Sequence, residues 1–190
     1  MITTYTGPMH SNKSGSMLDL YKSIYNKDCC LLFKPHKDDR DYGVVKSKGS
    51  EESFEAICIN ELDEILNYVN DDITNIFIDE IQLLTGNINV LLKLSIIDDI
   101  DIYCSGLNMT SEQKPFGIMP NILAISDKII NNYASCNLCG RPASYTYFEG
   151  EKGIIKIGDE GYLSLCTRCL RKKLIRSNDE RLVIKLRRDN

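Results

Sequence analysis

The 190-residue sequence contains no tryptophan, no long apolar run and no excess of basic side chains. A membrane-spanning helix needs about 20 consecutive apolar residues, so the sequence predicts no membrane segment. Met1 is followed directly by the strand-like segment Ile2–Tyr5, and we therefore expect no secretory leader. The formal net charge of −4 disfavours a dedicated nucleic-acid binder, because such proteins usually carry a basic stripe.

The composition is that of an ordinary globular protein, with 43% hydrophobic and 26% charged residues. The length predicts one domain, or one domain with a small appendage, and it suffices for a core without disulfide bonds. Eight cysteines are the one unusual count. Because thiols stay reduced in the cytoplasm, where we expect this protein, some cysteines should bind metal and the others should be buried.

Residues 1–135 alternate short apolar runs with longer amphipathic ones, which is typical of an α/β protein whose parallel sheet is covered by helices. A polar stretch, Pro35–Ser53, is predicted to be a loop. The predicted strands are Ile2–Tyr5, Cys29–Lys34, Ala56–Ile59, Asn75–Asp79 and Ile102–Ser105, and the predicted helices are Lys13–Asn26, Glu61–Val69 and Ile88–Ile97.

Residues 136–175 differ in character from the segment before them. Their alternating stretches Tyr145–Phe148 and Ile154–Ile157 favour a small hairpin module, which we call the lasso subdomain. Residues 176–190 form a highly charged tail that carries no functional signal.

Two Cys-x-x-Cys pairs stand in the lasso subdomain, Cys136 with Cys139 and Cys166 with Cys169. A two-residue gap lets both thiolates bind one tetrahedral ion, and two such turns complete a four-sulfur shell. Because a closed shell leaves no position for water, we predict a structural zinc site at the base of a zinc-ribbon-like loop. A redox pair or buried thiols are the alternative. The remaining cysteines lie in strand-like apolar runs and are interpreted as core residues: Cys29, Cys30, Cys58 and Cys104.

A second motif, Gly7-Pro-Met-His-Ser-Asn-Lys-Ser14, follows the first predicted strand and opens the first predicted helix. This is the place of a phosphate-binding loop, G-x-x-x-x-G-K-[ST], which holds phosphates with N–H groups and a lysine and supports Mg²⁺ with a hydroxyl. Asn12 replaces the second glycine. Asparagine tolerates the left-handed backbone better than most residues, so the loop should survive if Asn12 adopts that conformation. The first segment is therefore predicted to be a P-loop NTPase-like nucleotide-binding domain.

Two acidic residues, Asp79 and Glu80, close the apolar strand that begins at Asn75. In phosphate-loop enzymes an acid at this point supports Mg²⁺, directly or through water. A second acid beside it would face the substrate and accept a hydroxyl proton. A pair of solvated carboxylates at a strand end is the alternative interpretation.

Taken in order, the motifs resemble those of the type II thymidine kinases, a zinc-containing family of cells, bacteria and large DNA viruses. The resemblance extends from about Ile2 to Lys173. Its motifs are Gly7–Ser14 (family G-P-M-F-S-G-K-[ST]), Lys34-Pro35 with Asp39-Arg40 (K-P-x-x-D-x-R), Phe77–Gln82 ([FI]-I-D-E-x-Q-F), Lys114–Gly117 (K/E-P-F-G), Ala143–Thr146 (A-x-[FY]-T) and Gly158–Tyr162 (G-x-x-x-x-Y).

The resemblance implies a kinase that transfers the γ-phosphoryl group of ATP to the 5′-hydroxyl of thymidine or deoxyuridine. It implies Glu80 as the catalytic base, and Ser14 and Asp79 as the support for Mg²⁺. The implied ATP contacts are Gly7, Met9, His10, Ser11, Asn12, Lys13, Ser14 and Arg40. The implied nucleoside contacts are Met9, Leu83, Leu107, Phe116, Thr146, Gly158 and Tyr162.

The sequence departs from the family pattern in the phosphate loop, at Asn12, and around the expected substrate pocket. The departures of the second group are Leu83, Asn108, Ser111, Glu112 and Phe148, and the Gly158–Tyr162 spacing is one residue short. One hypothesis is an active thymidine or deoxyuridine kinase. A second is a pseudoenzyme of the same fold that binds nucleotide or a partner protein without turnover. A third is a zinc-ribbon protein built on an unrelated parallel-sheet domain.

The family resemblance also bears on assembly and location. It implies a homotetramer or a dimer that acts on ATP and a nucleoside, without nucleic-acid or membrane partners. The expected compartment is the cytoplasm, which for a viral gene is that of the host.

Overall fold

The computed structural model describes residues 1–24, 26–38, 43–46, 52–150 and 160–176. Its centre is a six-stranded sheet in the order β5-β2-β6-β7-β1-β8, in which every neighbouring pair is parallel. These strands are β1 (Ile2–Gly7), β2 (Cys30–Pro35), β5 (Ile57–Ile59), β6 (Asn75–Ile78), β7 (Asp101–Leu107) and β8 (Lys128–Asn131). The predicted α/β class with a parallel sheet is confirmed.

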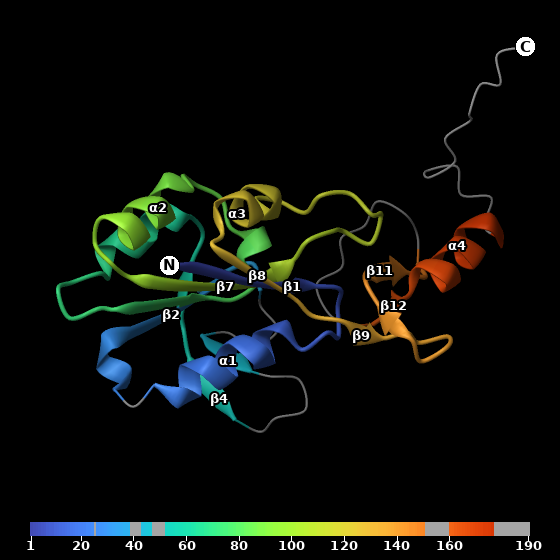
Figure 1. The fold of residues 1–190 in the computed structure, drawn as a ribbon, viewed down its shortest axis with the longest axis horizontal. Coiled ribbons are helices and arrows are strands. Elements are labelled where there is room, and N and C mark those ends of the chain that lie inside the picture. The colour runs from blue at the N-terminus through green and yellow to red at the C-terminus, as the bar shows by residue number, and fades with distance from the viewer. Residues whose placement is uncertain (25, 39–42, 47–51, 151–159, 177–190) are drawn as a thin grey trace, which may run out of the picture.

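Helices cover both faces of this sheet (Figure 1). Helix α1 (Lys13–Ser23) lies on one face, whereas α2 (Asn89–Ile96) and α3 (Met119–Ile125) lie on the other. Short 3₁₀ helices complete this part of the chain, namely η1 (Lys27–Cys29), η3 (Leu62–Asn67) and η4 (Ile81–Leu83). None of the helices in the described ranges combines the length and the apolar character that crossing a membrane requires.

The alternation of side chains along the strands explains the two-sided core. In β6, Ile76 and Ile78 pack in the cluster beneath α2 and α3, whereas Phe77 packs in the cluster beneath α1. Successive side chains of a strand point to opposite faces, so a strand covered on both faces must be apolar throughout. This requirement explains the unbroken apolar run of β6.

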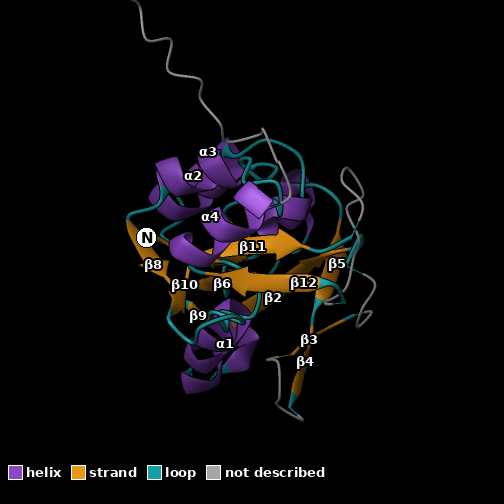
Figure 2. Cartoon of the chain, turned by 90° about the vertical axis from the view of Figure 1, so that its right-hand side faces the viewer, coloured by secondary structure: helices purple, strands orange, loops and turns teal. Residues whose placement is uncertain are grey.

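The lasso subdomain lies beside the sheet domain in Figure 1 and toward the viewer in Figure 2, and its buried residues form a separate small core. Strand β9 (Ala134–Ser135) leads into this subdomain and pairs with β10 (Pro142–Ala143). The antiparallel hairpin of β11 (Tyr145–Phe148) and β12 (Tyr162–Leu165) follows, and α4 (Thr167–Arg176) ends one residue beyond the predicted boundary. The buried residues of this core include Leu165, Leu170 and Leu174, which pack in the same cluster as Cys136 and Cys166. The predicted strand Tyr145–Phe148 is confirmed, whereas Ile154–Ile157 lies outside the described residues.

The structure corrects three predicted boundaries. Within the predicted loop Pro35–Ser53, β3 (Val44–Lys46) pairs with β4 (Ser53–Glu55). Helix α1 ends at Ser23 rather than Asn26, because the Asn26 side chain accepts a hydrogen bond from the Asp28 N–H and begins η1. The predicted helix Glu61–Val69 is the shorter 3₁₀ helix η3.

The prediction that the unpaired cysteines are core residues holds only for Cys104, which is fully buried in β7. Cys29, Cys30 and Cys58 are half-exposed. Cys29 precedes β2 and Cys30 begins it, while Cys58 belongs to the edge strand β5. Strand ends and edge strands are covered on fewer sides than the centre of a sheet, so their apolar patterns overstate burial.

Candidate functional site

The β1–α1 loop, residues 8–12, connects the first strand to the first helix at the carboxyl end of the sheet. Gly7 precedes it and lies close to the neighbouring chain segment, because a Cβ atom at this position would stand 2.2 Å from the backbone oxygen of Asn132. No side chain fits in that space. The glycine therefore lets the loop turn tightly against the end of β8.

Asn12 adopts the left-handed conformation that glycine would take, with φ 57° and ψ 35°, and is the N-cap of α1. His10 also has positive φ, at 61°. Left-handed residues within such a turn direct successive N–H groups toward one side, which creates a concavity suited to anions. Asn12 thus adopts the left-handed backbone conformation that an intact phosphate-binding loop requires at this position.

The side chains of Lys13 and Ser11 stabilise the loop by binding one of its own carbonyl groups. The Lys13 ammonium donates a hydrogen bond to the Pro8 carbonyl at 2.9 Å, and the Ser11 hydroxyl donates to the same oxygen at 2.8 Å. Lys13 is only 7% exposed. A cation is therefore held at the loop, at the positive end of the α1 dipole.

Asp79 lies just beyond β6 and is buried, with its carboxylate between two hydroxyl groups. Its Oδ1 atom accepts hydrogen bonds from Ser14 and from Ser105, each at 2.7 Å. Burial, and then the neighbouring charge of Glu80, raise the pKa of Asp79 to about 6, although the two hydroxyl bonds and Lys13 oppose the rise. This carboxylate therefore joins the first turn of α1 to the ends of β6 and β7.

Glu80 follows in the left-handed region, with φ 48° and ψ 38°. Its carboxylate accepts a hydrogen bond from the Gln82 amide at 2.6 Å, and the Gln82 Oε1 atom accepts one from the Leu107 N–H at 3.0 Å. Gly106 makes this contact possible, because a Cβ atom there would lie 2.4 Å from Gln82 Oε1. Gln82 thus orients Glu80 from the end of β7.

The β11–β12 hairpin holds the β1–α1 loop through the backbone of Met9. The Met9 N–H donates to the Thr146 hydroxyl at 3.0 Å, and the Ser164 hydroxyl donates to the Met9 carbonyl at 2.6 Å. Thr146 and Ser164 are directly paired across the hairpin. The His10 Nδ1 atom lies 3.3 Å from the Ser164 hydroxyl, so the His10 side chain contacts the hairpin from the β1–α1 loop.

The turn between Cys136 and Cys139 holds Ser164 through two hydrogen bonds. The Ser164 N–H donates to the Asn137 side-chain oxygen at 2.7 Å, and the Asn137 N–H donates to the Ser164 carbonyl at 2.9 Å. A continuous series of hydrogen bonds therefore connects the cysteine turn, the hairpin and the β1–α1 loop.

The residues expected to contact a nucleoside are distributed around this site. Thr146 is buried against Met9, and its carbonyl accepts a hydrogen bond from Gln113 at 3.0 Å, which joins the hairpin to residues 108–116. Tyr162 packs against Phe148, with ring centroids 4.7 Å apart. Leu83, Leu107 and Phe116 are half-buried on η4, at the end of β7 and before α3. Two further expected site residues, Arg40 and Gly158, lie outside the described residues.

Sequence reasoning assigned no role to several residues of this network, namely Ser105, Ser164, Gln82, Gln113 and Asn137. Ser105 could have been found, because side chains at the carboxyl ends of parallel strands converge on one edge and it ends a predicted strand. Ser164 carries no sequence signal, since only the hairpin register brings it to Met9.

The four paired cysteines form a compact cluster in which all sulfur atoms lie within 4.8 Å of one another. The Cys139 sulfur is 3.7 Å from that of Cys166 and 3.5 Å from that of Cys169. Tetrahedral zinc with Zn–S bonds of about 2.3 Å requires sulfur separations of about 3.8 Å, so this donor set fits the ion. The backbone N–H of Cys169 lowers the pKa of the Cys166 thiol, whereas the hydrogen bond with Cys139 raises the pKa of the Cys169 thiol to about 12. Metal binding must therefore displace a proton from this cluster.

The fold and the site together define an α/β protein in which a tight loop opens the first helix beside a buried aspartate, next to a four-cysteine subdomain. A sequence model described as thymidine kinase matches residues 1–170 of this chain. A curated thymidine kinase of Pseudothermotoga lettingae is 30% identical over 178 residues, which cover 90% of this chain and 95% of that protein. The chain belongs to the thymidine kinase family.

The cysteine cluster yields a test of metal binding. We expect the purified chain to contain about one zinc ion and Cys166→Ser to contain much less, because three thiolates leave the shell open. A chelator should lower the melting temperature of the native chain by at least about 5 °C, since metal binding to the folded state alone stabilises it. Cys58→Ser, which changes a cysteine outside the cluster, should behave as the native chain does. Zinc-free native protein, or full zinc content in Cys166→Ser, would contradict the assignment.

The environment of Asp79 yields a test of pH dependence. Its pKa, about 6 against an ordinary 3.8, means that the native carboxyl binds a proton more tightly than the unfolded one. The stability contributed by this group is therefore greatest below pH 4 and falls by about 3 kcal/mol as the pH rises through 6. Asp79→Asn should remove this fall, so the variant should gain about 3 kcal/mol relative to the native chain between pH 4 and pH 7.5.

Urea denaturation at several pH values measures this difference. Asp19→Asn, at an exposed position on α1, serves as the control and should follow the native chain within about 0.5 kcal/mol. A constant difference between Asp79→Asn and the native chain across this range would mean that the Asp79 carboxyl titrates alike in both states.

Proposed function

We propose that this protein is a thymidine kinase, which transfers the γ-phosphoryl group of ATP to the 5′-hydroxyl of thymidine or deoxyuridine. The observation that carries the proposal is the shared contact of Ser14 and Asp79, with Glu80 directly beside it. Family membership supports the reaction class, and the name of the Pseudothermotoga lettingae relative supports the substrate. Phosphoryl transfer needs positioned charges more than covalent chemistry, and these residues supply them.

The β1–α1 loop would bind the phosphates of ATP. The left-handed Asn12 and the first turn of α1 offer N–H groups to an anion, and Lys13 supplies a positive charge. The hydrogen bond from Lys13 to Pro8 would exchange for one to a phosphate oxygen, which is a stronger acceptor because it is charged.

Ser14 and Asp79 would hold the Mg²⁺ ion that accompanies ATP. A hydroxyl and a carboxylate are oxygen donors of the kind that Mg²⁺ prefers, and they already lie 2.7 Å apart. An ion held there would supply positive charge to the phosphates. Burial and the adjacent Glu80 charge raise the pKa of Asp79, and a divalent cation at this carboxylate would favour its ionised form.

Glu80 would act as the general base. Its carboxylate accepts the proton of the 5′-hydroxyl, the hydroxyl oxygen bonds to the γ-phosphorus, and the bond to the β-phosphate oxygen breaks to release ADP. The Gln82 amide fixes the carboxylate for this role. The nucleoside would lie among Met9, Leu107 and Thr146, with the hairpin excluding water, which would otherwise accept the phosphoryl group.

Replacement of Glu80 by glutamine tests the catalytic assignment. With ATP, Mg²⁺ and a panel of nucleosides, we expect the native chain to phosphorylate thymidine or deoxyuridine and Glu80→Gln to lower kcat by about 10²–10⁴-fold. Glu55→Gln, an exposed acid on β4, should leave the rate unchanged. An undiminished rate in Glu80→Gln would remove Glu80 as the base. No product from the native chain with any nucleoside would favour the pseudoenzyme.

Substitution at Asn12 tests the loop separately from catalysis. Because Asn12 is already left-handed, Asn12→Gly should change the dissociation constant of ATP by less than about threefold. Asn12→Val should weaken ATP binding by about tenfold or more, since a β-branched residue resists this conformation. Calorimetric titration measures both. A large gain in affinity for Asn12→Gly would mean that asparagine distorts the loop.

A further inference from the structure

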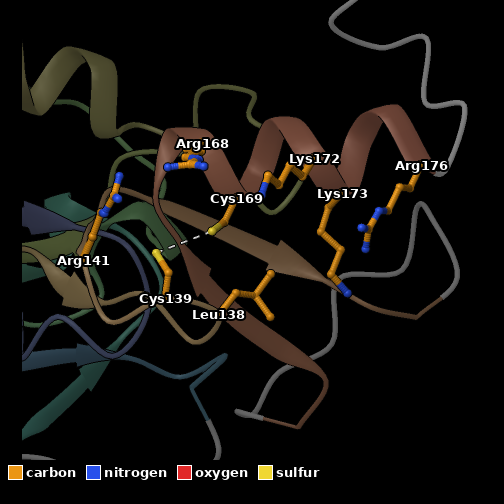
Figure 3. Close-up of a pocket in the computed structure, with 8 residues that line it drawn as sticks. All are labelled: Leu138, Cys139, Arg141, Arg168, Cys169, Lys172, Lys173 and Arg176. Atoms are coloured by element: carbon orange, nitrogen blue, oxygen red, sulfur yellow. Dashed lines mark hydrogen bonds between the residues drawn. The ribbon is translucent and has the colours of Figure 1, made fainter.

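A pocket of about 360 Å³ lies between α4 and the cysteine turn that contains Leu138 (Figure 3). The proposed kinase reaction makes no use of it. Apart from Leu138 and two of the clustered cysteines, every residue that lines it is basic, namely Arg141, Arg168, Lys172, Lys173 and Arg176. Its volume falls within the range of sites that bind small molecules.

The basic side chains follow from the sequence of α4. This helix contains five cations and no acidic residue, although the chain as a whole has a net charge of −4. Arg168, Lys172 and Arg176 recur every four residues, so they share one face at steps of about 6 Å along the helix. Like charges at this spacing repel one another, and the folded chain is therefore stabilised by an anion placed among them.

Most of these charges lack a partner in the protein. Lys173 donates to the Glu149 carboxylate at 2.6 Å, but the side chains of Arg141, Arg168, Lys172 and Arg176 make no hydrogen bond or ion pair within the ranges that the structure describes. A zinc ion with four thiolates has a formal charge of about −2, which balances only half of these four cations. A positive charge of about 2 is left over.

We propose that this pocket binds a phosphate monoester of about nucleotide size. Such a group carries a charge of about −1.5 to −2 near neutral pH and offers three acceptor oxygens. Guanidinium groups such as those of Arg141 and Arg168 match these oxygens with paired N–H donors. Leu138, which is 52% exposed, provides apolar surface for a ring attached to the phosphate. A carboxylate supplies half the charge and one fewer oxygen.

The test uses phenyl phosphate and inorganic phosphate with the full, zinc-loaded chain, followed by amide chemical shifts. Phenyl phosphate should shift resonances of α4 and of the cysteine turn, and it should bind more tightly than inorganic phosphate because of Leu138. Lys172→Glu should raise its dissociation constant by about tenfold. Arg171→Glu makes the same charge change on the adjacent residue, which does not line the pocket, and should have a much smaller effect.

Three results would overturn the proposal. The first is no shift in α4 with phenyl phosphate. The second is an equal loss of affinity in Lys172→Glu and Arg171→Glu, which would indicate long-range attraction without a site. The third is binding that disappears in Lys13→Ala, which would place the ligand at the β1–α1 loop.

Arg176→Glu replaces Lys172→Glu if the latter loses zinc. A single-stranded oligonucleotide that binds α4 when phenyl phosphate does not would identify a nucleic-acid surface instead.

Discussion

The backbone of Met9 is the point on which the geometry of the site depends. Its N–H and its carbonyl are bonded to Thr146 and Ser164, which face each other across the hairpin. Met9 is half-buried, and two such hydrogen bonds contribute about 0.5–1.5 kcal/mol each, so together they hold the loop against the hairpin. Asn137 continues the connection into the cysteine turn. This arrangement gives the four-cysteine cluster a direct role in positioning a loop of the sheet domain.

The parallel sheet imposes the second constraint. The carboxyl ends of its strands meet at one edge, so Gly7, Asp79 and Ser105 lie side by side although they are far apart in the sequence. The cost of this convergence is a buried carboxylate whose ionised form is poorly solvated, as the raised pKa of Asp79 indicates. Functional sites commonly retain such locally unfavourable groups, because the reaction they serve requires charge in a protected place.

Sequence reasoning predicted the parallel sheet, the four-cysteine cluster and the backbone condition at Asn12, because each has a local pattern. Apolar runs revealed the central strands, but they failed for the short helix α3 and the edge strand β8, whose patterns are brief and half-exposed. They also overstated the burial of Cys29 and Cys58 at the margins of the sheet. Contacts such as Ser164 with Met9 depend on strand register between distant segments, and no local pattern encodes that register.

Amide hydrogen exchange tests most directly the claim that the lasso subdomain positions the β1–α1 loop. Exchange would be measured for residues 7–14 and for the hairpin, in the metal-loaded chain and after a chelator has removed the metal. The account predicts that the Met9 amide and its neighbours lose protection together with β11 and β12, while the central strands β6 and β7 stay protected. Unchanged protection of the loop, alongside faster exchange in the hairpin, would contradict it.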